Sequence, residues 1–530
     1  MAFTGCLAEE PTSEATTPSA EKQKPTTALP GARHSTSPIA RRAGNTNPRA
    51  QARPGIPTAR PRIAQHAERP AGARAAPTPR LATFASAATI DDLRQTGTPA
   101  KPSIAHETII PPRPQLARRP RRLVEPPRVV ARPSSRPRSQ PRVTAAVPTS
   151  AAPGLATFFA HLNDLKQGRR NTVTILHLGD SHIASDMLPR AIRARLQKRF
   201  GDAGRGMLQP SAPFRWHRAD HITFSASGPW KTQSSLTGGP GLYGLTGVIK
   251  RATSPDARLS LTTSRYAFDE ATVTLLTGPS YGQAVLRVGD VERTVNAYAP
   301  RPGSRTFTIT QRGRTLSVRP DGDGPIAVAS WSILNTRPGI RYVNLGIVGA
   351  SAWTTSKWQR RQMRRDLARL DPSLIIIGYG TNDAFKPTLQ ARRYARHVKG
   401  LLKTLKRGAP AASMLMILPP GAARKGDGKR SGITCGGLDP AWGLLAKLPT
   451  VRRVLARQAR QHGAAVWDQA TTMGGLCGIA TWVKATPPLA KGDHVHLSKA
   501  GYARASTALY RHLMALYDSR RQLISRNSAR

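Results

Sequence analysis

Short apolar runs, each long enough for one buried strand, constrain the fold of this chain most strongly. They are "TVTILHLGD" (172–180), "YVNLGIVG" (342–349), "SLIIIGYG" (373–380), "ASMLMILPP" (412–420) and "AAVWD" (464–468). Helical patterns separate them, among them "MLPRAIRARLQKRFG" and "ARRYARHVKGLLKTLKR", and a last helix, "KAGYARASTALYRHLMALY", closes the series. Buried strands that alternate with helices are typical of an α/β fold with a parallel sheet. The sequence therefore predicts a doubly wound parallel sheet.

The region between about 211 and 340 has a different pattern, with short alternating runs such as "EATVTLLTG" and "QAVLRVGDVERTVNA". The segments "VGDV" and "QRGR" have the composition of hairpin turns, and no helix-length pattern interrupts the runs. We expect an antiparallel β-sandwich, 211–340, inserted between the first and second strands of the α/β domain. That domain would then consist of two segments, 151–210 and 341–520.

Residues 1–150 are dominated by Pro, Ala, Arg, Thr and Ser, as in "ARPGIPTARPRIAQ", with almost no aromatic residues. Such a segment cannot bury enough apolar surface to offset its ordering entropy, so we predict a long disordered N-terminal tail of basic character. Residues 521–530 are predicted to form a short basic C-terminal tail.

The formal net charge is +52, from 81 Lys and Arg against 29 Asp and Glu. Most of the excess lies after residue 150, in runs such as "WQRRQMRRDLARL" and "ARRYARHVKGLLKTLKR". These runs are either solvated helix faces or a basic surface for an anionic polymer such as nucleic acid, anionic lipid or an acidic cell-wall polymer. No zinc-finger, helix-turn-helix or RNA-binding signature accompanies the charge, so no specific nucleic-acid partner is expected.

The chain has no run of 18 apolar residues, so no transmembrane segment is predicted. It has three cysteines. Cys435 and Cys477 flank one loop-rich region and are candidates for a disulfide in an oxidising compartment. Cys6, in "AFTGCLAEE", is either a lipid-anchor site, if the true start lies upstream, or a stray thiol in the tail.

The segment "GDSH" follows the first predicted strand and places Ser181 at its carboxyl end, where open α/β sheets bind ligands. Alone, Gly-Asp-Ser is common turn chemistry. A nucleophilic Ser also needs a base, a carboxylate that orients the base, and donors for an oxyanion.

The base candidates lie in "KGDHVHLSKAGY", shortly before the last helix. Asp493 and His496 are three residues apart, so that the carboxylate can hold the tautomer of the imidazole. His494 is the alternative base. A His-x-His pair also fits metal binding, but Cys435 and Cys477 are not in ligand spacing and no acidic cluster completes a site, so no metal is expected.

Two further strand ends carry candidate donors. "GIVGAS" contains Gly349, where the missing side chain lets a backbone N–H approach an oxyanion. "GTND" contains Asn382, whose amide can donate a second hydrogen bond.

Gly-Asp-Ser, "GIVGAS", "GTND" and Asp-x-x-His in this order resemble the SGNH/GDSL hydrolase family over about 150–210 and 341–520. The resemblance implies a flavodoxin-like sheet and a serine esterase without a cofactor. It further implies Ser181 as nucleophile, His496 as base, Asp493 as its orienter, and an oxyanion hole from the N–H groups of Ser181 and Gly349 with the Asn382 amide.

Many members of the family carry Leu at the position of His182. "GDSH", the downstream "FGDAGRG" and the inserted β-domain resemble the branch that contains bacterial peptidoglycan O-acetyl esterases and O-acetyltransferases, in which the insertion is similar to a carbohydrate-binding module. This resemblance implies removal of acyl groups, acetyl above all, from a cell-envelope or extracellular polysaccharide. It also implies a periplasmic or envelope location, although the sequence leaves the cytoplasm open.

Alternatives remain at this point. An acyltransferase would use the same triad with a sugar hydroxyl in place of water. A polysaccharide-binding protein would keep the α/β site only as a vestige, although all four site residues are intact. A lipase or thioesterase would need an apolar acyl channel that no stretch of the sequence marks.

Overall fold

The computed structural model describes residues 153–528, apart from 215, 428–432 and 434. The predicted N-terminal tail and Cys6 lie outside the described residues. No helix in the described part of the chain is both long enough and apolar enough to cross a bilayer.

A five-stranded parallel sheet forms the centre of the α/β part, in the order β13-β1-β14-β15-β18. Each of β1's neighbours pairs with it in parallel, Ile175 lying beside Tyr342 on one side and Leu374 on the other. This order, in which the second strand lies outside the first, confirms the predicted doubly wound sheet. The parallel strands are β1 (Thr172–Gly179), β13 (Gly339–Gly346), β14 (Pro372–Gly378), β15 (Ser413–Leu418) and β18 (Ala465–Asp468).

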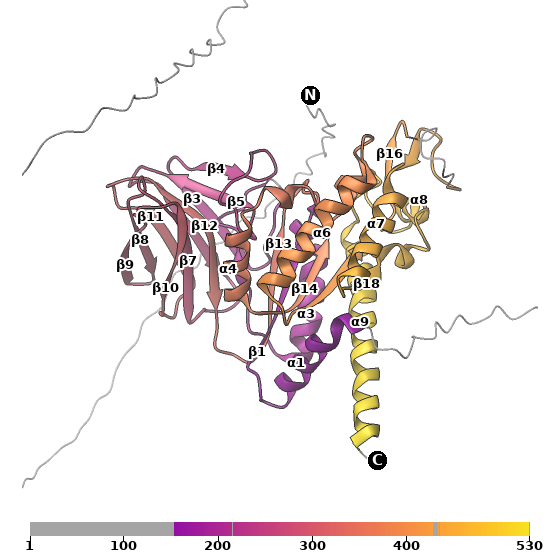
Figure 1. Cartoon of the computed structure of the whole chain (residues 1–530), viewed down its shortest axis with the longest axis horizontal. Coiled ribbons are helices and arrows are strands. Elements are labelled where there is room, and N and C mark those ends of the chain that lie inside the picture. The colour runs from indigo at the N-terminus through magenta and orange to yellow at the C-terminus, as the bar shows by residue number, and fades with distance from the viewer. Residues whose placement is uncertain (1–152, 215, 428–432, 434, 529–530) are drawn as a thin grey trace, which may run out of the picture. The chain divides into compact units, whose positions relative to one another are not determined.

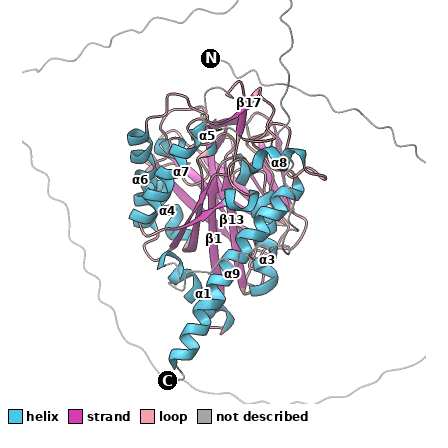
Figure 2. Cartoon of the chain, turned by 90° about the vertical axis from the view of Figure 1, so that its right-hand side faces the viewer, coloured by secondary structure: helices cyan, strands magenta, loops and turns pink. Residues whose placement is uncertain are grey.

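Helices cover both faces of this sheet, which is why its strands are continuous apolar runs. Figure 2 shows α4, α6 and α7 on one side of the strands and α3 and α9 on the other. The two sides bury separate apolar clusters against the sheet. The main helices are α1 (Ala156–Lys166), α3 (Met187–Phe200), α4 (Arg360–Leu370), α6 (Ala391–Gly408), α7 (Leu448–Gln461) and α9 (Lys499–Ser528).

Shorter elements lie in the connections between the strands and helices. They are α2 (Ser181–Ala184), α5 (Thr381–Ala384), α8 (Gly478–Lys484), the hairpin of β16 (Ala423–Lys425) and β17 (Trp442–Leu444), and the 3-10 turns η1 (Pro153–Leu155), η2 (Thr354–Lys357) and η3 (Gln469–Met473). The last helix, α9, extends to Ser528 and includes most of the segment 521–530 that was predicted as a tail.

The insertion between β1 and β13 consists of two antiparallel sheets, seen at the left of Figure 1. One has the order β10-β7-β12-β5-β4 with β2 beside β12, and the other has the order β3-β6-β11-β8-β9. Trp331, Leu286 and Leu261 belong to the apolar core that the two sheets share. The predicted inserted β-sandwich is therefore confirmed, whereas its boundaries at 211 and 340 stay predictions.

The strands of the insertion follow one another without an intervening helix. They are β2 (Gly206–Leu208), β3 (Ile222–Ser227), β4 (Lys231–Ser234), β5 (Val248–Ala252), β6 (Arg258–Thr263), β7 (Glu270–Thr277), β8 (Gln283–Val288), β9 (Val291–Asn296), β10 (Gly303–Ile309), β11 (Thr315–Pro320) and β12 (Ile326–Leu334).

Of the two predicted hairpin turns, one is correct. Val288 pairs with Val291 across Gly289 and Asp290, so "VGDV" closes the β8–β9 hairpin. The segment "QRGR" instead connects β10 with β11, which belong to different sheets. The hairpin expectation there is wrong, because turn composition reports a local reversal of the chain but not which sheet the next strand joins.

The two connections to the insertion lie side by side. The backbone N–H of Ile340 donates to the carbonyl of Gly201 at 2.9 Å, and Ala203 donates to the carbonyl of Ile340 at 3.1 Å. A Cβ on Gly339 would lie 2.1 Å from the carbonyl carbon of Gly201. Gly339 therefore permits an approach that any larger residue would block.

A buried carboxylate, Asp186, joins α3 to the connections around the insertion. Its two oxygens accept hydrogen bonds from both terminal nitrogens of Arg193 at 3.1 Å and from Arg205 Nη1 at 3.0 Å. Asn344 Nδ2 on β13 and the N–H of Asp220 donate to it as well, at 3.0 and 2.8 Å. Burial alone would raise the pKa of Asp186, but the charges of Arg193 and Arg205 hold it well below its usual range.

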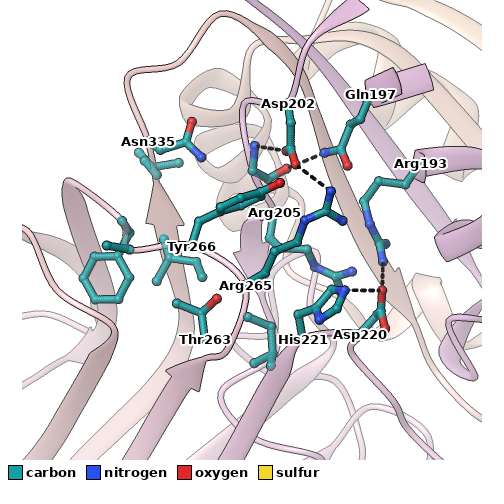
Figure 3. A pocket seen from close by; sticks show the side chains of 16 residues that line it. Arg193, Gln197, Asp202, Arg205, Asp220, His221, Thr263, Arg265, Tyr266 and Asn335 are labelled. Atoms are coloured by element: carbon teal, nitrogen blue, oxygen red, sulfur yellow. Dashed lines mark hydrogen bonds and ion pairs between the residues drawn. The ribbon is translucent and has the colours of Figure 1, made fainter. Parts of the chain in front are cut away.

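A cavity borders this cluster between α3 and the insertion, and Figure 3 shows its lining. Arg193 and His221 both reach the carboxylate of Asp220, at 3.5 and 3.4 Å. Arg265 reaches Asp202 at 3.6 Å on the opposite side of the cavity. The cations and carboxylates around the cavity are thus paired with one another.

A disulfide joins Cys435, in the loop between β16 and β17, to Cys477 immediately before α8, with a Cα–Cα distance of 5.2 Å. The bond closes a segment of 42 residues, which includes β17, α7 and β18.

We expect Asp186→Asn to destabilise the fold by about 3–5 kcal/mol, because Arg193 and Arg205 would remain buried without their shared carboxylate. Asp164→Asn is the matched control, because it breaks the solvent-exposed pair with Arg169 and should cost less than about 1 kcal/mol. Chemical denaturation of both variants measures the difference. Equal losses of stability in the two variants would contradict the assigned role of Asp186.

We expect Cys435→Ser to lower the free energy of unfolding by about 4 kcal/mol, because the open segment regains loop entropy in the unfolded chain. Alkylation of denatured, unreduced protein followed by mass spectrometry should modify one of the three cysteines, and all three after reduction. Three modified cysteines without reduction would show that the bond does not form.

Candidate active site

Ser181 is the first residue of α2 and directly follows β1 through Asp180. The carboxylate of Asp180 accepts a hydrogen bond from the N–H of His182 at 3.0 Å and so caps the short helix. A Cβ on Gly179 would lie 2.3 Å from Ile183 Cγ1, and one on Gly346 would lie 2.2 Å from the nitrogen of Ala184. Glycine at both strand ends therefore lets α2 fold back over the sheet and place Ser181 at its carboxyl edge.

Ser181, His496 and Asp493 form one chain of hydrogen bonds. Ser181 Oγ lies 2.8 Å from His496 Nε2, and His496 Nδ1 lies 2.7 Å from Asp493 Oδ2. The other oxygen of Asp493 accepts from the N–H groups of Val495 and His496, each at 2.9 Å, which fixes the turn that carries the histidine. The structure thus brings together three of the residues predicted from the sequence.

The electrostatics of Asp493 keep it charged. Partial burial acts to raise its pKa, but the hydrogen bonds and charge of His496 and the N–H of Val495 outweigh this and lower it to about 2. The imidazole of His496 therefore faces an ionised carboxylate at Nδ1 and a hydroxyl at Nε2 throughout the neutral range.

His494, the alternative base, contacts Trp442 and not Ser181. Its backbone has a φ of 55°, and its ring packs on Trp442 with the ring centroids 3.9 Å apart. Its Nδ1 lies 2.9 Å from the carbonyl oxygen of Gly492. His496, and not His494, is the histidine that contacts Ser181.

Gly349 lies on the loop that follows β13, and Asn382 lies in the short helix α5 that follows β14; these two strands flank β1. Gly349 has a φ of 78°, which favours glycine. Asn382 Nδ2 donates to the carbonyl of Ala350 at 3.0 Å, so its amide is tied to the loop that contains Gly349. Within the described residues no side-chain hydrogen bond links Asn382 to Ser181 or His496.

Asp383 was not identified from the sequence, yet it holds the same loop. Its carboxylate is buried and accepts from the N–H of Ala352 at 3.1 Å, and burial raises its pKa to about 6. Asn382 and Asp383 together therefore attach α5 to residues 350–352. The segment "GTND" could have indicated this, because a second polar residue follows the asparagine.

His182 is buried behind the histidine of the triad. Its ring centroid lies 5.4 Å from that of His496, and its Nδ1 lies 2.9 Å from the hydroxyl of Tyr502 on α9. Burial, followed by the charge of His496, lowers its pKa to about 3. His182 is therefore a neutral ring that supports His496, and a leucine there could not contact Tyr502 through a hydrogen bond.

Two exposed tryptophans, also not identified from the sequence, lie beside segments that carry candidate site residues. Trp216 is 60% exposed, and its ring centroid lies 5.9 Å from the ammonium of Lys491. The backbone N–H of Lys491 donates to the carbonyl of His496. Trp353 is 38% exposed on the loop after Gly349. Exposure of a large aromatic side chain depends on the fold and has no signal in the sequence pattern.

Across the part of the chain that the structure describes, no three His, Cys, Asp or Glu side chains gather into a group that could hold a metal ion.

Comparisons with known proteins agree with this geometry. Residues 309–504 match the model of the GDSL-like Lipase/Acylhydrolase family, a range that contains Gly349, Asn382, Asp493 and His496 but not Ser181. A search of curated proteins found no match.

Solved structures give a further comparison. The structure described as "Peptidoglycan O-acetylesterase in action" is similar with 27% identity and a TM-score of 0.59, over 70% of this chain and 97% of that chain. A protein from Bacillus subtilis also matches, with 13% identity and a TM-score of 0.27 over 54% of this chain and 88% of its own. The family match and the first of these structures agree with the described fold. They support an enzyme that hydrolyses ester bonds through a GDSL-like acylhydrolase domain, and the chain resembles the SGNH/GDSL branch that contains the peptidoglycan O-acetylesterase.

Proposed function

We propose that this protein is a serine esterase that removes acyl groups, O-acetyl above all, from a cell-envelope or extracellular polysaccharide through an acyl-enzyme. The single observation that carries the proposal is the hydrogen-bond chain from Ser181 through His496 to Asp493 at the carboxyl edge of the parallel sheet. This arrangement is the one that activates a serine hydroxyl in acyl transfer.

The chemistry follows from these contacts. His496 Nε2 takes the proton of Ser181 as Oγ forms a bond to the ester carbonyl carbon, and the ionised Asp493 stabilises the imidazolium. The ester C–O bond then breaks, and the sugar oxygen leaves with the proton from His496. In the second half, His496 takes a proton from water, the hydroxide oxygen attacks the acyl group, and Ser181 regains its proton as the free acid departs.

The negative charge on the carbonyl oxygen needs donors in both halves. The N–H of Ser181 lies in the first turn of α2, where a helix leaves its N–H groups without intrahelical acceptors. The N–H of Gly349 and the amide of Asn382 are the other two donors that we assign. The hydrogen bond of Asn382 to Ala350 supports this assignment, because it ties the two donor loops together.

A polysaccharide substrate is supported by the similarity to the peptidoglycan O-acetylesterase and by two exposed tryptophans, Trp216 beside the His496 turn and Trp353 in the groove that Asp383 lines. Aromatic side chains that are exposed beside a hydrophilic site offer flat apolar surface to a sugar ring. An envelope or extracellular location agrees with the Cys435–Cys477 disulfide, since such bonds persist in oxidising compartments. The candidate lipid anchor, Cys6, lies outside the described residues.

We expect Asn382→Ala to lower kcat on an aryl acetate by about 10²–10³-fold, because one oxyanion donor is lost. Ser181→Ala should abolish turnover and serves as the blank. Asn296→Ala, an exposed position on β9, is the matched control and should keep full activity. Acetate release from O-acetylated peptidoglycan should follow the same order. Full esterase activity of purified Ser181→Ala or Asn382→Ala would overturn the proposal, and acetyl transfer to a sugar in preference to water would make the enzyme a transferase.

We expect Asp493→Asn to lower kcat by about 10³–10⁴-fold, because a neutral amide cannot stabilise the imidazolium. The pKa of Asp493 is lowered to about 2, so in the wild type this carboxylate stays charged as the pH falls from 8 to 4. Its stabilising effect on the fold is therefore present above its unfolded-state pKa and is lost only as the pH falls through about 2. The profile of kcat/KM against pH should show no step from Asp493 above pH 4. A step at pH 4–5 that Asp493→Asn removes would contradict this assignment.

A further inference from the structure

Exposed basic side chains crowd the outer surface of three neighbouring helices, α4, α6 and α7. Figure 2 shows these helices on the same side of the parallel sheet. The acidic side chain within them, Asp366, is buried. The exposed cations are Arg360, Arg361, Arg364 and Arg369 on α4, Arg392, Arg393, Arg396, Lys399, Lys403, Lys406 and Arg407 on α6, and Arg453, Arg457 and Arg460 on α7.

On α6 these cations form a row. Arg392, Arg396, Lys399, Lys403 and Lys406 follow one another at spacings of four and three residues, so they share one side of the helix over about 21 Å. Among the described residues, none of these five has a carboxylate within ion-pair distance. Like charges at these spacings destabilise a helix, so the row does not serve the stability of the fold.

A groove of about 350 Å³ lies beside the row at the first turns of α6, since Arg393 and His397 in its lining are the chain neighbours of Arg392 and Arg396. Trp353, Lys386, Arg393 and His397 line it, together with Asp383, which directly follows Asn382. The ammonium groups of Lys357 and Lys386 lie 4.5 and 5.0 Å from the Trp353 ring centroid. The groove therefore joins the basic row to the edge of the sheet that carries the proposed oxyanion donor.

The groove has a positive environment. Burial and then the charges of Arg393, Arg396 and Lys386 lower the pKa of His397, so all three cations act on this side chain. The buried carboxylate of Asp383 interacts with the charge of Lys386, whereas Arg393 and Arg396 have no carboxylate within ion-pair distance among the described residues.

We propose that the groove and the α6 row form one binding surface, the α6 track, for a carboxylate-bearing glycan chain whose acyl groups are cleaved at Ser181. The inference rests on the proposed function. A linear polyanion can place a carboxylate opposite each unpaired cation along the whole length of the row. Because the groove lies between the row and the active-site edge, the same glycan chain can present an ester to the serine.

A membrane surface fits the track less well. Membrane-bound helices add apolar anchors to their basic residues. Of the large apolar side chains that are exposed in the described residues, Trp353 lies at the groove, whereas α4, α6 and α7 carry none.

The test compares two triple variants with equal loss of charge. The first, Lys399→Gln with Lys403→Gln and Lys406→Gln, removes cations from the far end of the row. The control, Lys198→Gln with Lys231→Gln and Lys484→Gln, removes three exposed cations from α3, β4 and α8. The substrates are acetylated polygalacturonate, the same polymer after amidation of its carboxylates, and an aryl acetate.

We expect the α6 variant to raise KM for the anionic polymer by about tenfold at low salt, with kcat unchanged, because three favourable charge contacts are lost. Its kcat/KM on the amidated polymer and the aryl acetate should equal that of the wild type. The control variant should change KM for the anionic polymer by less than twofold.

Equal effects of the two variants, or none in the α6 variant, would overturn the α6 track. So would an unchanged polymer KM accompanied by lost binding to phosphatidylglycerol vesicles or to duplex DNA, which would assign the row to a membrane or to nucleic acid. Cosedimentation of Ser181→Ala protein with the polymer measures the track without catalysis, so a failure of the esterase proposal stays distinguishable from a failure of the track.

Discussion

The placement of the site depends on a close backbone approach at the ends of two adjacent strands. Gly179 ends β1 and Gly346 ends β13, and a side chain on either would collide with α2. The short helix can therefore lie directly on the sheet edge, with Asp180 as its cap and Ser181 in its first turn. The base, the carboxylate that orients it and the proposed oxyanion donors then lie on segments at the same edge, since the carboxyl ends of parallel strands meet at one edge of the sheet.

The buried cluster around Asp186 connects this edge to the insertion. Asn344, on the strand beside β1, donates both to Asp186 and to the carbonyl of Ile183 in α2. The same carboxylate holds Arg193 of α3 and Arg205 at the start of the insertion. A carboxylate that is hydrogen-bonded in this way fixes the orientation of the groups around it more strictly than apolar contacts do, because each hydrogen bond has a preferred geometry.

The sequence was sufficient for the parallel sheet and the inserted sandwich, because each leaves a local pattern. It also named Ser181, His496 and Asp493, which the structure joins by hydrogen bonds, and their catalytic roles stay predictions. Continuous apolar runs predicted strands buried on both faces, and the four polar strand ends predicted a common edge. The preference for His496 over His494 came from the family resemblance, and no local pattern in the sequence explains it. It depends on a positive φ at His494, which turns that ring onto Trp442, a residue distant in the chain. The course of "QRGR" between two sheets, the contact of His182 with Tyr502 and the exposure of Trp216 and Trp353 likewise depend on long-range packing.

The paired connections at Gly201 and Gly339 have a consequence for how such a chain can change. The backbone leaves the α/β part at Gly201 and returns at Ile340 within one hydrogen bond of its point of departure. The sandwich is therefore an insertion whose two ends are held together at the edge of the α/β part. The entropic cost of closing such a loop grows only slowly with the number of residues between its ends. Parts of the sandwich that are distant from Arg205 and Asp220 can therefore gain or lose residues at little entropic cost to the parallel sheet.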